Sequence, residues 1–281
     1  MRRGAVWAGA LAALGAMSQA VLADAPLKRL TLRQDVLGWE AVGRVEMEEK
    51  GFCTGVLIAP DLVLTAAHCL FGGSDHYVQP SKMTFRAGLS DGQALAQSGV
   101  ARMVVHPRYD PEAPDRMEQI RYDAGLMQLA APVSLSVAAP FQVDTLNADA
   151  RDLSVVSYGR GRSEALSWDD KCSVLGRAQG LVAFDCDVTF GSSGAPVFHR
   201  MGNRAAIVSL VSAGVSGQGK TFAVGMELPG LVADMKAALR RGEGASVSQE
   251  APADQAQARA GIRPAPQFGA RGAGGAKFVK P

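Results

Sequence analysis

The chain has 281 residues and carries 29 Lys and Arg residues against 27 Asp and Glu residues, which gives a formal net charge of +2. This length can bury a sizeable core as one large all-β domain or as two smaller ones. The net charge is small and the basic residues are scattered, so we expect no nucleic-acid partner.

The N-terminus has the features of a secretory signal peptide. Two arginines precede an apolar run over residues 5–17, and small residues follow at 21–23. The pattern predicts a signal peptide over 1–23, followed at 24–38 by a mature N-terminal segment or a propeptide. The apolar run is too short for a stable membrane span. We therefore expect a secreted or periplasmic protein.

Short apolar runs separated by turn residues fill the first half of the chain. They lie at 39–47, 52–58, 62–65, 83–89, 101–106 and 124–129. Residues 107–114 hold three prolines and are expected to form a loop. Runs of this length, with frequent turns and no long helical periodicity, predict an all-β sandwich or barrel over about 39–130.

A second set of strand-like runs follows a crossing segment at 130–152. These runs lie at 153–159, 181–184, 195–199, 205–211 and 221–226, and predict a second β unit over about 153–226. The one convincing helix is predicted at 228–240, because Pro229 suits its first turn and Gly242 its end. The tail at 242–281 is rich in Ala, Gly and Pro and is expected to be disordered, which limits the folded domain to 39–241.

The four cysteines indicate disulfides, because an even number of cysteines in an exported chain favours cystines over metal or redox chemistry. Four cysteines allow three pairings, and their spacing does not decide among them. We favour the two local loops, Cys53–Cys69 and Cys172–Cys186. No CxxC or HxxxH spacing occurs, so neither a metal nor another cofactor is expected.

One candidate nucleophile is Ser193, which lies in the stretch Phe190-Gly191-Ser192-Ser193-Gly194-Ala195-Pro196. Glycine on both sides allows a sharp turn and the close approach of a substrate carbonyl. The N–H groups of Gly191 and Ser193 can then converge to form an oxyanion hole. A serine between glycines is also typical of an ordinary tight turn, so catalysis needs a base and an orienting acid elsewhere in the chain.

His68 is the best candidate for the base among the four histidines. It follows an apolar strand and lies beside a cysteine, an arrangement that would hold an imidazole in one orientation. His76 lies in a polar loop, His106 lies before a proline, and His199 ends the strand after Ser193. The candidate acid is Asp123, because it opens the buried run 124–129 and a buried carboxylate needs a hydrogen-bond donor.

Three motifs resemble those of the chymotrypsin-fold serine proteases. Cys53-Thr54-Gly55-Val56-Leu57-Ile58 with Leu64-Thr65-Ala66-Ala67-His68-Cys69 resembles their histidine region, Tyr122-Asp123-Ala124-Gly125-Leu126 their aspartate strand, and Gly191-Ser192-Ser193-Gly194-Ala195-Pro196 their serine loop. The order His, Asp, Ser also matches. The secreted bacterial, glutamyl-endopeptidase-like branch is the nearest by resemblance, because Cys186 precedes the serine loop.

The resemblance implies an all-β fold of two six-stranded barrels, with the active site in the cleft between them and a C-terminal helix. It implies a serine endopeptidase that cleaves polypeptide substrates through an acyl-enzyme, with His68, Asp123 and Ser193 as its triad. For substrate binding it suggests Asp187 and Thr189 ahead of the serine loop. It also suggests Ser209 and Val211 on a strand beside the specificity pocket.

Two departures from the family pattern are visible. Ser192 stands where the animal digestive enzymes carry an aspartate that pairs with a freed N-terminus, so we expect no activation by a buried α-amino group. Val208 precedes Ser209 where glutamate-cleaving relatives carry a histidine, which weakens the case for a glutamate preference. The alternative interpretation is a catalytically silent member of the same fold that serves as a secreted binding or scaffold module.

Overall fold

The computed structural model describes residues 27–48, 51–72, 76–148, 150–202, 204–217 and 220–247. The predicted signal peptide at 1–23 and most of the predicted tail at 242–281 lie outside these residues. Among the helices described, none has the length and apolar character needed to cross a membrane.

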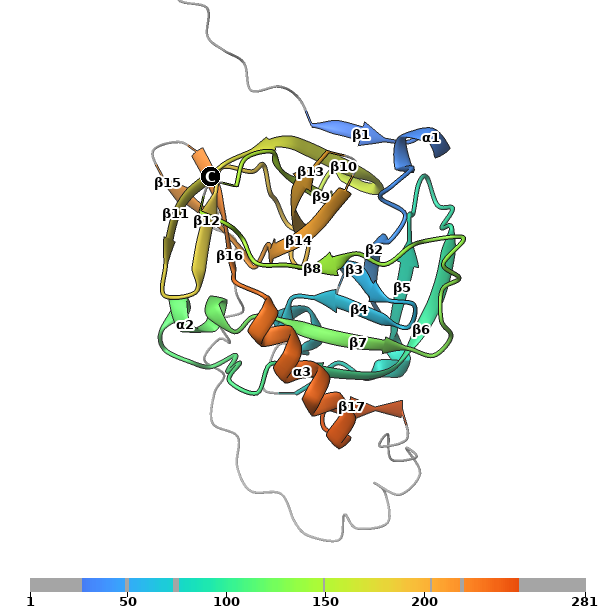
Figure 1. The fold of residues 1–281 in the computed structure, drawn as a ribbon. Helices are drawn as coiled ribbons and strands as arrows, with labels where there is room; N and C mark the ends of the chain where they lie inside the picture. Colours follow the sequence, from blue (N-terminus) through green and yellow to red (C-terminus); the bar gives the residue numbers. More distant parts are fainter. Residues whose placement is uncertain are drawn as a thin grey trace, which may run out of the picture.

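Six strands of the N-terminal half close into the first barrel (Figure 1). They are β2 (Val42–Met47), β3 (Gly51–Ala59), β4 (Leu62–Thr65), β5 (Met83–Ala87), β6 (Ala96–Val105) and β7 (Gly125–Leu129). The ring closes because β6 pairs with both β5 and β7. Side chains alternate between the two faces of each strand, and inward-facing residues such as Val45, Phe85 and Met103 form one buried apolar cluster.

The second barrel is built from two hydrogen-bonded sheets. The first has six strands in the order β1 (Lys28–Leu30), β10 (Arg162–Cys172), β9 (Leu153–Gly159), β13 (Pro196–Met201), β14 (Arg204–Leu210) and β8 (Gln142–Val143). The second has four strands in the order β11 (Val174–Ala178), β12 (Leu181–Phe184), β16 (Lys220–Met226) and β15 (Ala213–Gly217). Val155, Phe184, Val197 and Ala223 form a buried cluster from both sheets.

A third apolar cluster joins the two barrels. It contains Val56 and Leu126 from the first barrel and Phe198 and Ile207 from the second, all buried. The C-terminal helix α3 (Pro229–Arg241) adds Met235 to the same cluster and lies beside β7 in Figure 1. The two barrels therefore share one continuous core.

The two-barrel fold predicted from the sequence is confirmed, as is the C-terminal helix. Gly242 ends α3 in the left-handed conformation with φ of 84°, and Pro229 opens its first turn, as the sequence indicated. The second barrel differs in detail from a single six-stranded ring, because β1 and β8 extend one of its two sheets.

Both ends of the predicted folded domain extend further than expected. Before residue 39, β1 pairs with β10 and its Leu30 is fully buried, and the short helix α1 (Arg33–Val36) follows it. After residue 241, β17 (Ala245–Ser246) pairs with β6. The first residues of the tail that was predicted to be disordered are therefore part of the first barrel's sheet.

Short helical turns occupy three connections. η1 (Ala67–Leu70) follows β4, η2 (Pro80–Lys82) precedes β5, and α2 (Arg116–Arg121) lies between β6 and β7. Asp115 caps α2 by accepting a hydrogen bond of 2.8 Å from the Met117 N–H. Of these turns, η1 bears most directly on the site, because it carries His68.

Candidate active site

His68 lies in η1, immediately after β4 ends at Thr65. A disulfide between Cys53 on β3 and Cys69 on η1 ties this turn to the barrel. The backbone N–H of His68 also donates a hydrogen bond of 2.8 Å to Asp123 Oδ1. Because the backbone is held on both sides of the imidazole, the ring keeps one orientation while a quarter of its side-chain surface stays exposed.

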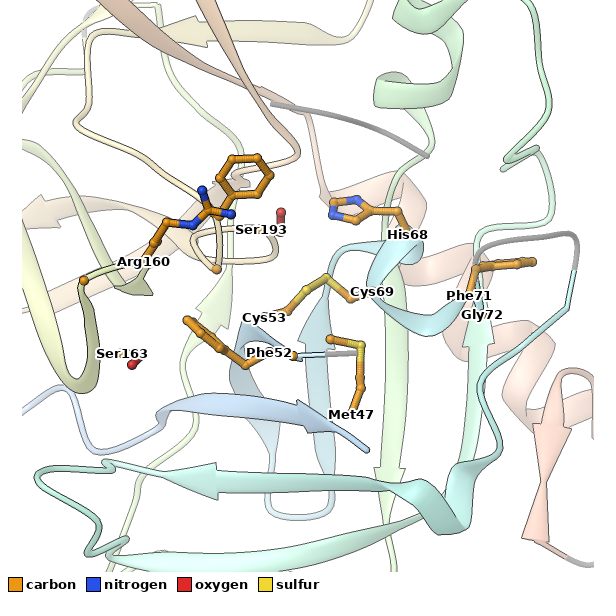
Figure 2. A pocket seen from close by; sticks show the side chains of 14 residues that line it. Met47, Phe52, Cys53, His68, Cys69, Phe71, Gly72, Arg160, Ser163 and Ser193 are labelled. Carbon is orange, nitrogen blue, oxygen red and sulfur yellow. A yellow bond between two sulfur atoms is a disulfide. The ribbon is translucent and has the colours of Figure 1, made fainter. Parts of the chain in front are cut away.

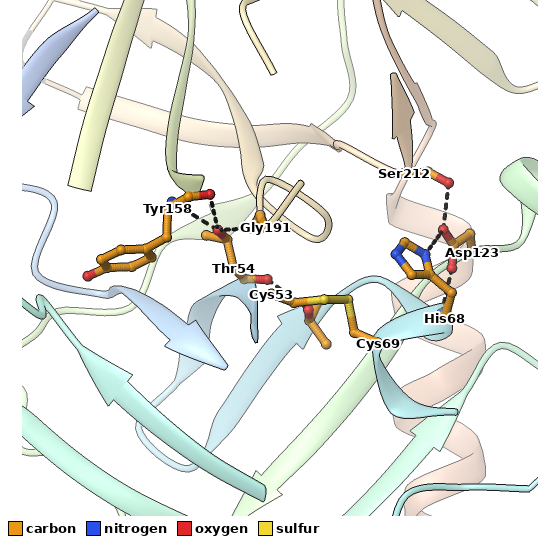
Figure 3. The surroundings of a disulfide bond; sticks show 9 residues. Cys53, Thr54, His68, Cys69, Asp123, Tyr158, Gly191 and Ser212 are labelled. Atoms are coloured by element: carbon orange, nitrogen blue, oxygen red, sulfur yellow. Dashed lines mark hydrogen bonds and ion pairs between the residues drawn. A yellow bond between two sulfur atoms is a disulfide. The ribbon is translucent and has the colours of Figure 1, made fainter. Parts of the chain in front are cut away.

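Asp123 lies just before β7 and is almost completely buried, with 3% of the residue exposed. Three hydrogen bonds satisfy it (Figure 3). Besides the His68 N–H, the His68 Nδ1 lies 2.7 Å from Oδ2, and the Ser212 hydroxyl donates to the same oxygen at 2.5 Å. This arrangement holds the proton on Nδ1 and leaves Nε2 of His68 as the basic atom.

The surroundings raise the pKa of His68 above its ordinary value of 6.5. Burial acts in the opposite direction, because it disfavours the charged imidazolium, and the charge of Arg116 also lowers the pKa. The charge of Asp123 and its hydrogen bond together outweigh both effects. The site therefore stabilises the imidazolium that a general base becomes after it accepts a proton.

Ser193 lies in a loop whose glycines are required by their surroundings. Gly194 has φ of 75°, and a Cβ there would lie 2.4 Å from the carbonyl oxygen of Thr54. Gly191 has φ of 92°, and a Cβ there would lie 2.2 Å from the ring of Phe52. The loop thus packs against β3 at a distance that only glycine permits.

Backbone hydrogen bonds fix this loop to both barrels. The Thr54 N–H on β3 donates to the Ser193 carbonyl at 2.9 Å, and the Thr54 hydroxyl donates to the Gly191 carbonyl at 2.8 Å. On the other side, the Gly194 N–H donates to the Val211 carbonyl at 2.7 Å. Within the part of the chain that the structure describes, the N–H groups of Gly191 and Ser193 donate to no protein acceptor. They remain available for a substrate oxygen.

His68, Gly191 and Ser193 line one cavity of about 660 Å³ between the barrels. Figure 2 shows the Ser193 hydroxyl on the side of the cavity that faces the His68 imidazole. The serine comes from the second half of the chain, whereas the histidine and the aspartate come from the first barrel. The structure therefore brings together the three residues that the sequence nominated, from elements far apart along the chain.

Two of the four residues suggested for substrate binding lie in the core. Ser209 is fully buried on β14, and its hydroxyl donates to the Met226 carbonyl at 2.8 Å. Val211 is fully buried in the apolar cluster of the second barrel. The serine that reaches the site is Ser212, three residues after Ser209 and next to the first residue of β15. This placement corrects the suggestion made from the sequence.

The other two suggested residues lie near the serine loop without lining the cavity. Asp187 is exposed, and its N–H donates to Asp169 Oδ2 at 2.8 Å. The carbonyl of Thr189 accepts a hydrogen bond of 2.9 Å from the Ser192 N–H, so Thr189 supports the turn before Ser193. No described contact places Asp187 at the base of a pocket.

The cysteines pair within the two local loops that we favoured, Cys53–Cys69 and Cys172–Cys186. The second disulfide joins the end of β10 to the segment before the serine loop. His68 lies near both sulfurs of the first disulfide, with ligand atoms within 4.8 Å of one another. Both sulfurs are bonded to each other, so this group offers a metal ion the imidazole alone.

Sequence reasoning missed two residues that shape the site. Ser212 completes the hydrogen bonding of Asp123, and its sequence signal is a serine followed by Ala213 and Gly214. Thr54 holds two carbonyls of the serine loop, and it lies within the histidine motif next to Cys53. Neither contact is local in sequence, because the partners of Ser212 and Thr54 are 89 and 137 residues away.

Two barrels around a buried carboxylate, a histidine and a glycine-flanked serine form the architecture of the chymotrypsin-fold serine proteases. The family model described as Trypsin matches residues 35–228 of this chain. The chain belongs to the trypsin family of serine proteases.

Known relatives match shorter stretches. "Serine protease 56" of Homo sapiens is 32% identical over 99 residues, which cover 34% of this chain and 14% of that protein. "Trypsin" of Phaedon cochleariae is 35% identical over 86 residues, which cover 30% of each chain. The chain thus matches less than a third of the length of either relative.

A solved structure of Glu endopeptidase in complex with MPD has a similar fold. Its TM-score is 0.59 with 20% sequence identity, and the match covers 71% of this chain and 90% of that one. At this identity the likeness concerns the fold alone.

Proposed function

We propose that this chain is a secreted serine endopeptidase that hydrolyses peptide bonds through an acyl-enzyme. The observation that carries the proposal is the hydrogen-bonded pair of His68 and the buried Asp123, which faces Ser193 across one cavity. A serine hydroxyl is a weak nucleophile until a base accepts its proton, and this pair supplies an oriented base.

In the proposed reaction, His68 Nε2 accepts the Ser193 proton as Oγ attacks the scissile carbonyl carbon. The carbonyl oxygen becomes an oxyanion and accepts hydrogen bonds from the N–H groups of Gly191 and Ser193. The imidazolium, stabilised by Asp123, then gives its proton to the leaving nitrogen, and the C–N bond breaks. Water repeats the sequence on the acyl-enzyme, which releases the acid and restores the Ser193 hydroxyl.

The two halves of a peptide substrate would lie on opposite sides of Ser193. β15 begins beside Ser212 and is the last strand of its sheet, so one of its edges faces no other described strand. Such an edge accepts an extended peptide as an added strand. The leaving half would lie toward His68, because this residue must protonate the leaving nitrogen.

Activation is proposed to need no buried α-amino group. Ser192 is fully buried, and its hydroxyl lies 3.2 Å from that of Ser157 and 3.4 Å from a guanidinium nitrogen of Arg162. A serine cannot form the ion pair that a freed N-terminus makes with an aspartate. The folding of the serine loop is instead supported by neutral hydrogen bonds and by the Arg162 side chain.

Export is part of the proposal. The predicted signal peptide at 1–23 and the two disulfides support a secreted or periplasmic location. The glutamyl-endopeptidase-like branch is proposed from the position of Cys186 ahead of the serine loop, and the proposal names no preferred residue before the scissile bond. A histidine before the site serine is lacking, because Val211 precedes Ser212. Cleavage-site mapping with a peptide library assigns this preference.

A fluorophosphonate probe tests the proposed nucleophile directly. We expect the purified full chain to become covalently labelled, and Ser193→Ala and His68→Ala to remain unlabelled while keeping the wild-type circular dichroism spectrum. A wild-type protein that stays unlabelled in every processed form would contradict the proposal. The secreted binding or scaffold module would then be the better interpretation.

A further inference from the structure

The cavity at Ser193 is lined by apolar side chains around the Cys53–Cys69 disulfide. Beyond the Cys53–Cys69 disulfide, its lining continues with Met47, Phe52 and Phe71 (Figure 2). These side chains come from the first barrel and from the turn after η1. Apolar walls with few polar groups are typical of sites that accept a ligand side chain.

Arg160 provides a charge on the wall that faces His68 across Ser193. It follows β9 in the second barrel, is exposed, and extends along the cavity toward Ser193 (Figure 2). Its guanidinium carbon lies 4.0 Å from the ring centroid of Phe190, the residue before Gly191. This stacking holds the guanidinium beside the oxyanion loop and leaves its N–H edges free to bind a carboxylate.

No carboxylate neutralises Arg160 within the part of the chain that the structure describes. Among the described residues that line the cavity there is no Asp or Glu, and no described salt bridge includes Arg160. Arg160 and the catalytic His68 are the basic residues of this lining. A cation stacked over an aromatic ring and exposed to a concave site favours an anionic ligand.

The neighbouring cavity provides a contrast within the same molecule. It shares Met47, Phe52 and Ser163 with the first cavity, and it also contains Arg44. There the guanidinium is already paired with the carboxylates of Glu46 and Glu164. The same lining holds a second cation, Lys82, and three carboxylates, those of Glu46, Glu48 and Glu164. Of these two described cavities, the one with an uncompensated positive charge is therefore the cavity at Ser193.

We propose that Arg160 selects substrates with an acidic side chain among the first residues after the scissile bond. This inference rests on the proposed function, because the leaving half is assigned to this cavity by the proton that His68 must deliver to it. The acidic side chain pairs with the Arg160 guanidinium, and a neighbouring apolar side chain packs against Met47 and Phe52.

Acyl transfer to added peptides measures how well a peptide binds where the leaving half of the substrate would lie. The full chain is given the N-acyl amino-acid ester that it hydrolyses fastest in a panel, so that an acyl-enzyme accumulates on Ser193. Tripeptide amides then compete with water for the acyl-enzyme. The free amine of the tripeptide attacks the carbonyl carbon of the acyl-enzyme ester and gives a proton to His68. The bond to Ser193 Oγ then breaks, the serine takes up this proton, and a new peptide bond is left. The acceptors are alanine tripeptide amides with Glu or Gln at the first, second or third position.

We expect Glu to be a better acceptor than Gln at one position at least, by about two- to fivefold, the range of an exposed charge pair. The ratio of the transfer rate to the Glu acceptor over that to the Gln acceptor should approach one in Arg160→Gln. It should also approach one for the wild type at high salt, because added ions screen exposed charges. Arg160→Glu should favour Lys acceptors instead. The matched control is Arg204→Gln, an exposed arginine on β14 outside the cavity, which should keep the wild-type ratio.

The outcomes separate the two proposals. If the wild type and Arg160→Gln have equal Glu-to-Gln acceptor ratios while both hydrolyse the ester, the role of Arg160 is overturned. The proposed serine endopeptidase function would be unaffected by that result. If Arg204→Gln also loses the preference for Glu over Gln acceptors, the role of Arg160 is overturned too, because the preference would then come from net charge alone. Failure of the wild type to form any acyl-enzyme would overturn the proposed function and the inference together.

Discussion

Asp123 organises the candidate site at the scale of single residues. Its carboxylate accepts hydrogen bonds from two atoms of His68 and from Ser212, a residue of the other half of the chain. A buried carboxylate is tolerated because all three donors are present. Every property of the proposed base, its tautomer, its orientation and its pKa, therefore depends on this one side chain.

The first prediction concerns Asp123→Asn, which keeps the shape of the side chain and removes its charge. We expect kcat/KM for peptide hydrolysis to fall by about 10⁴-fold, the loss typical of a misdirected tautomer in such a triad. Labelling by a fluorophosphonate should slow in parallel. A variant that retains a tenth of the wild-type rate would contradict the role given to Asp123.

The second prediction is the pH dependence of the wild type. The base must be neutral to accept the Ser193 proton, so kcat/KM should rise with pH through the pKa of His68, and the raised pKa puts this limb above pH 6.5. In Asp123→Asn the cause that raises the pKa is gone and burial remains, so the limb of the residual activity should move to lower pH. An unchanged limb in the variant would contradict the assignment of His68.

The third prediction compares two glycines with positive φ. Gly194→Ala places a Cβ against the Thr54 carbonyl, so we expect a loss of about 2–5 kcal/mol in the free energy of unfolding, from strain and overpacking together. Gly92 has φ of 83° and open space around it, so Gly92→Ala should cost only about 1–2 kcal/mol. Urea unfolding followed by fluorescence measures both.

At the scale of elements, the N-terminal segment has a structural role. β1 extends the six-stranded sheet, its register with β10 runs from Lys28↔Trp168 to Leu30↔Leu166, and Leu30 is fully buried. The segment is thus held by pairing and burial. Among the described residues, the Ser192 hydroxyl hydrogen-bonds with Ser157, Tyr158, Thr189 and Arg162, none of which belongs to this segment.

The fourth prediction follows from this arrangement. Forms of the protein that begin at Asp24, at Ala25 or with one extra alanine before Asp24 should have the same kcat/KM within about twofold. Truncation to residue 32 removes β1 and should lower the melting temperature, because the buried Leu30 and three strand pairings are lost. Strict dependence of activity on one N-terminal residue, with stability unchanged, would contradict this prediction.

The sequence predicted the elements that carry strong local signals. His68, Asp123 and Ser193 each lie in a short motif with small or apolar neighbours, and α3 has a proline and a glycine at its ends. Ser209 was suggested for the site where the structure has Ser212, because both serines follow apolar runs. The pairing of β14 and β15 with their neighbouring strands decides which of the two serines contacts Asp123. The apolar residues before each serine do not determine this register.

Elements without a local signal were missed. β10 (Arg162–Cys172) alternates little and carries five charged residues, and β1 is three residues long. Both are strands because a neighbouring strand supplies their hydrogen bonds and the core covers their apolar positions. The contact of Arg160 with Phe190 is likewise tertiary, since 30 residues separate them in the sequence.

At the scale of the whole molecule, one core holds the two barrels together. Met235 on α3 is fully buried in the cluster that also contains Leu126 and Phe198, one from each barrel. The C-terminal helix and β17 both pack against β6, so the end of the described chain contacts the first barrel. The relative position of His68 and Ser193 depends on this shared core.

The fifth prediction tests that dependence. Met235→Ala should lower the free energy of unfolding by about 2–5 kcal/mol, as expected for a large-to-small change in a core. Fluorophosphonate labelling during a slow thermal ramp should decline together with the unfolding of either barrel. Labelling that survives the loss of the first barrel's structure would show that the nucleophile does not need His68.

The distribution of the site over the two halves has a consequence for the order in which the protein acquires activity. A ribosome delivers His68 and Asp123 with the first barrel, and Ser193 and Ser212 follow 70 and 89 residues after Asp123. A chain that has folded its first barrel alone contains a base with no nucleophile and a carboxylate with one donor missing. The proposed proteolytic activity therefore requires the docked pair of barrels, and we expect a chain that ends before Ser193 to have none.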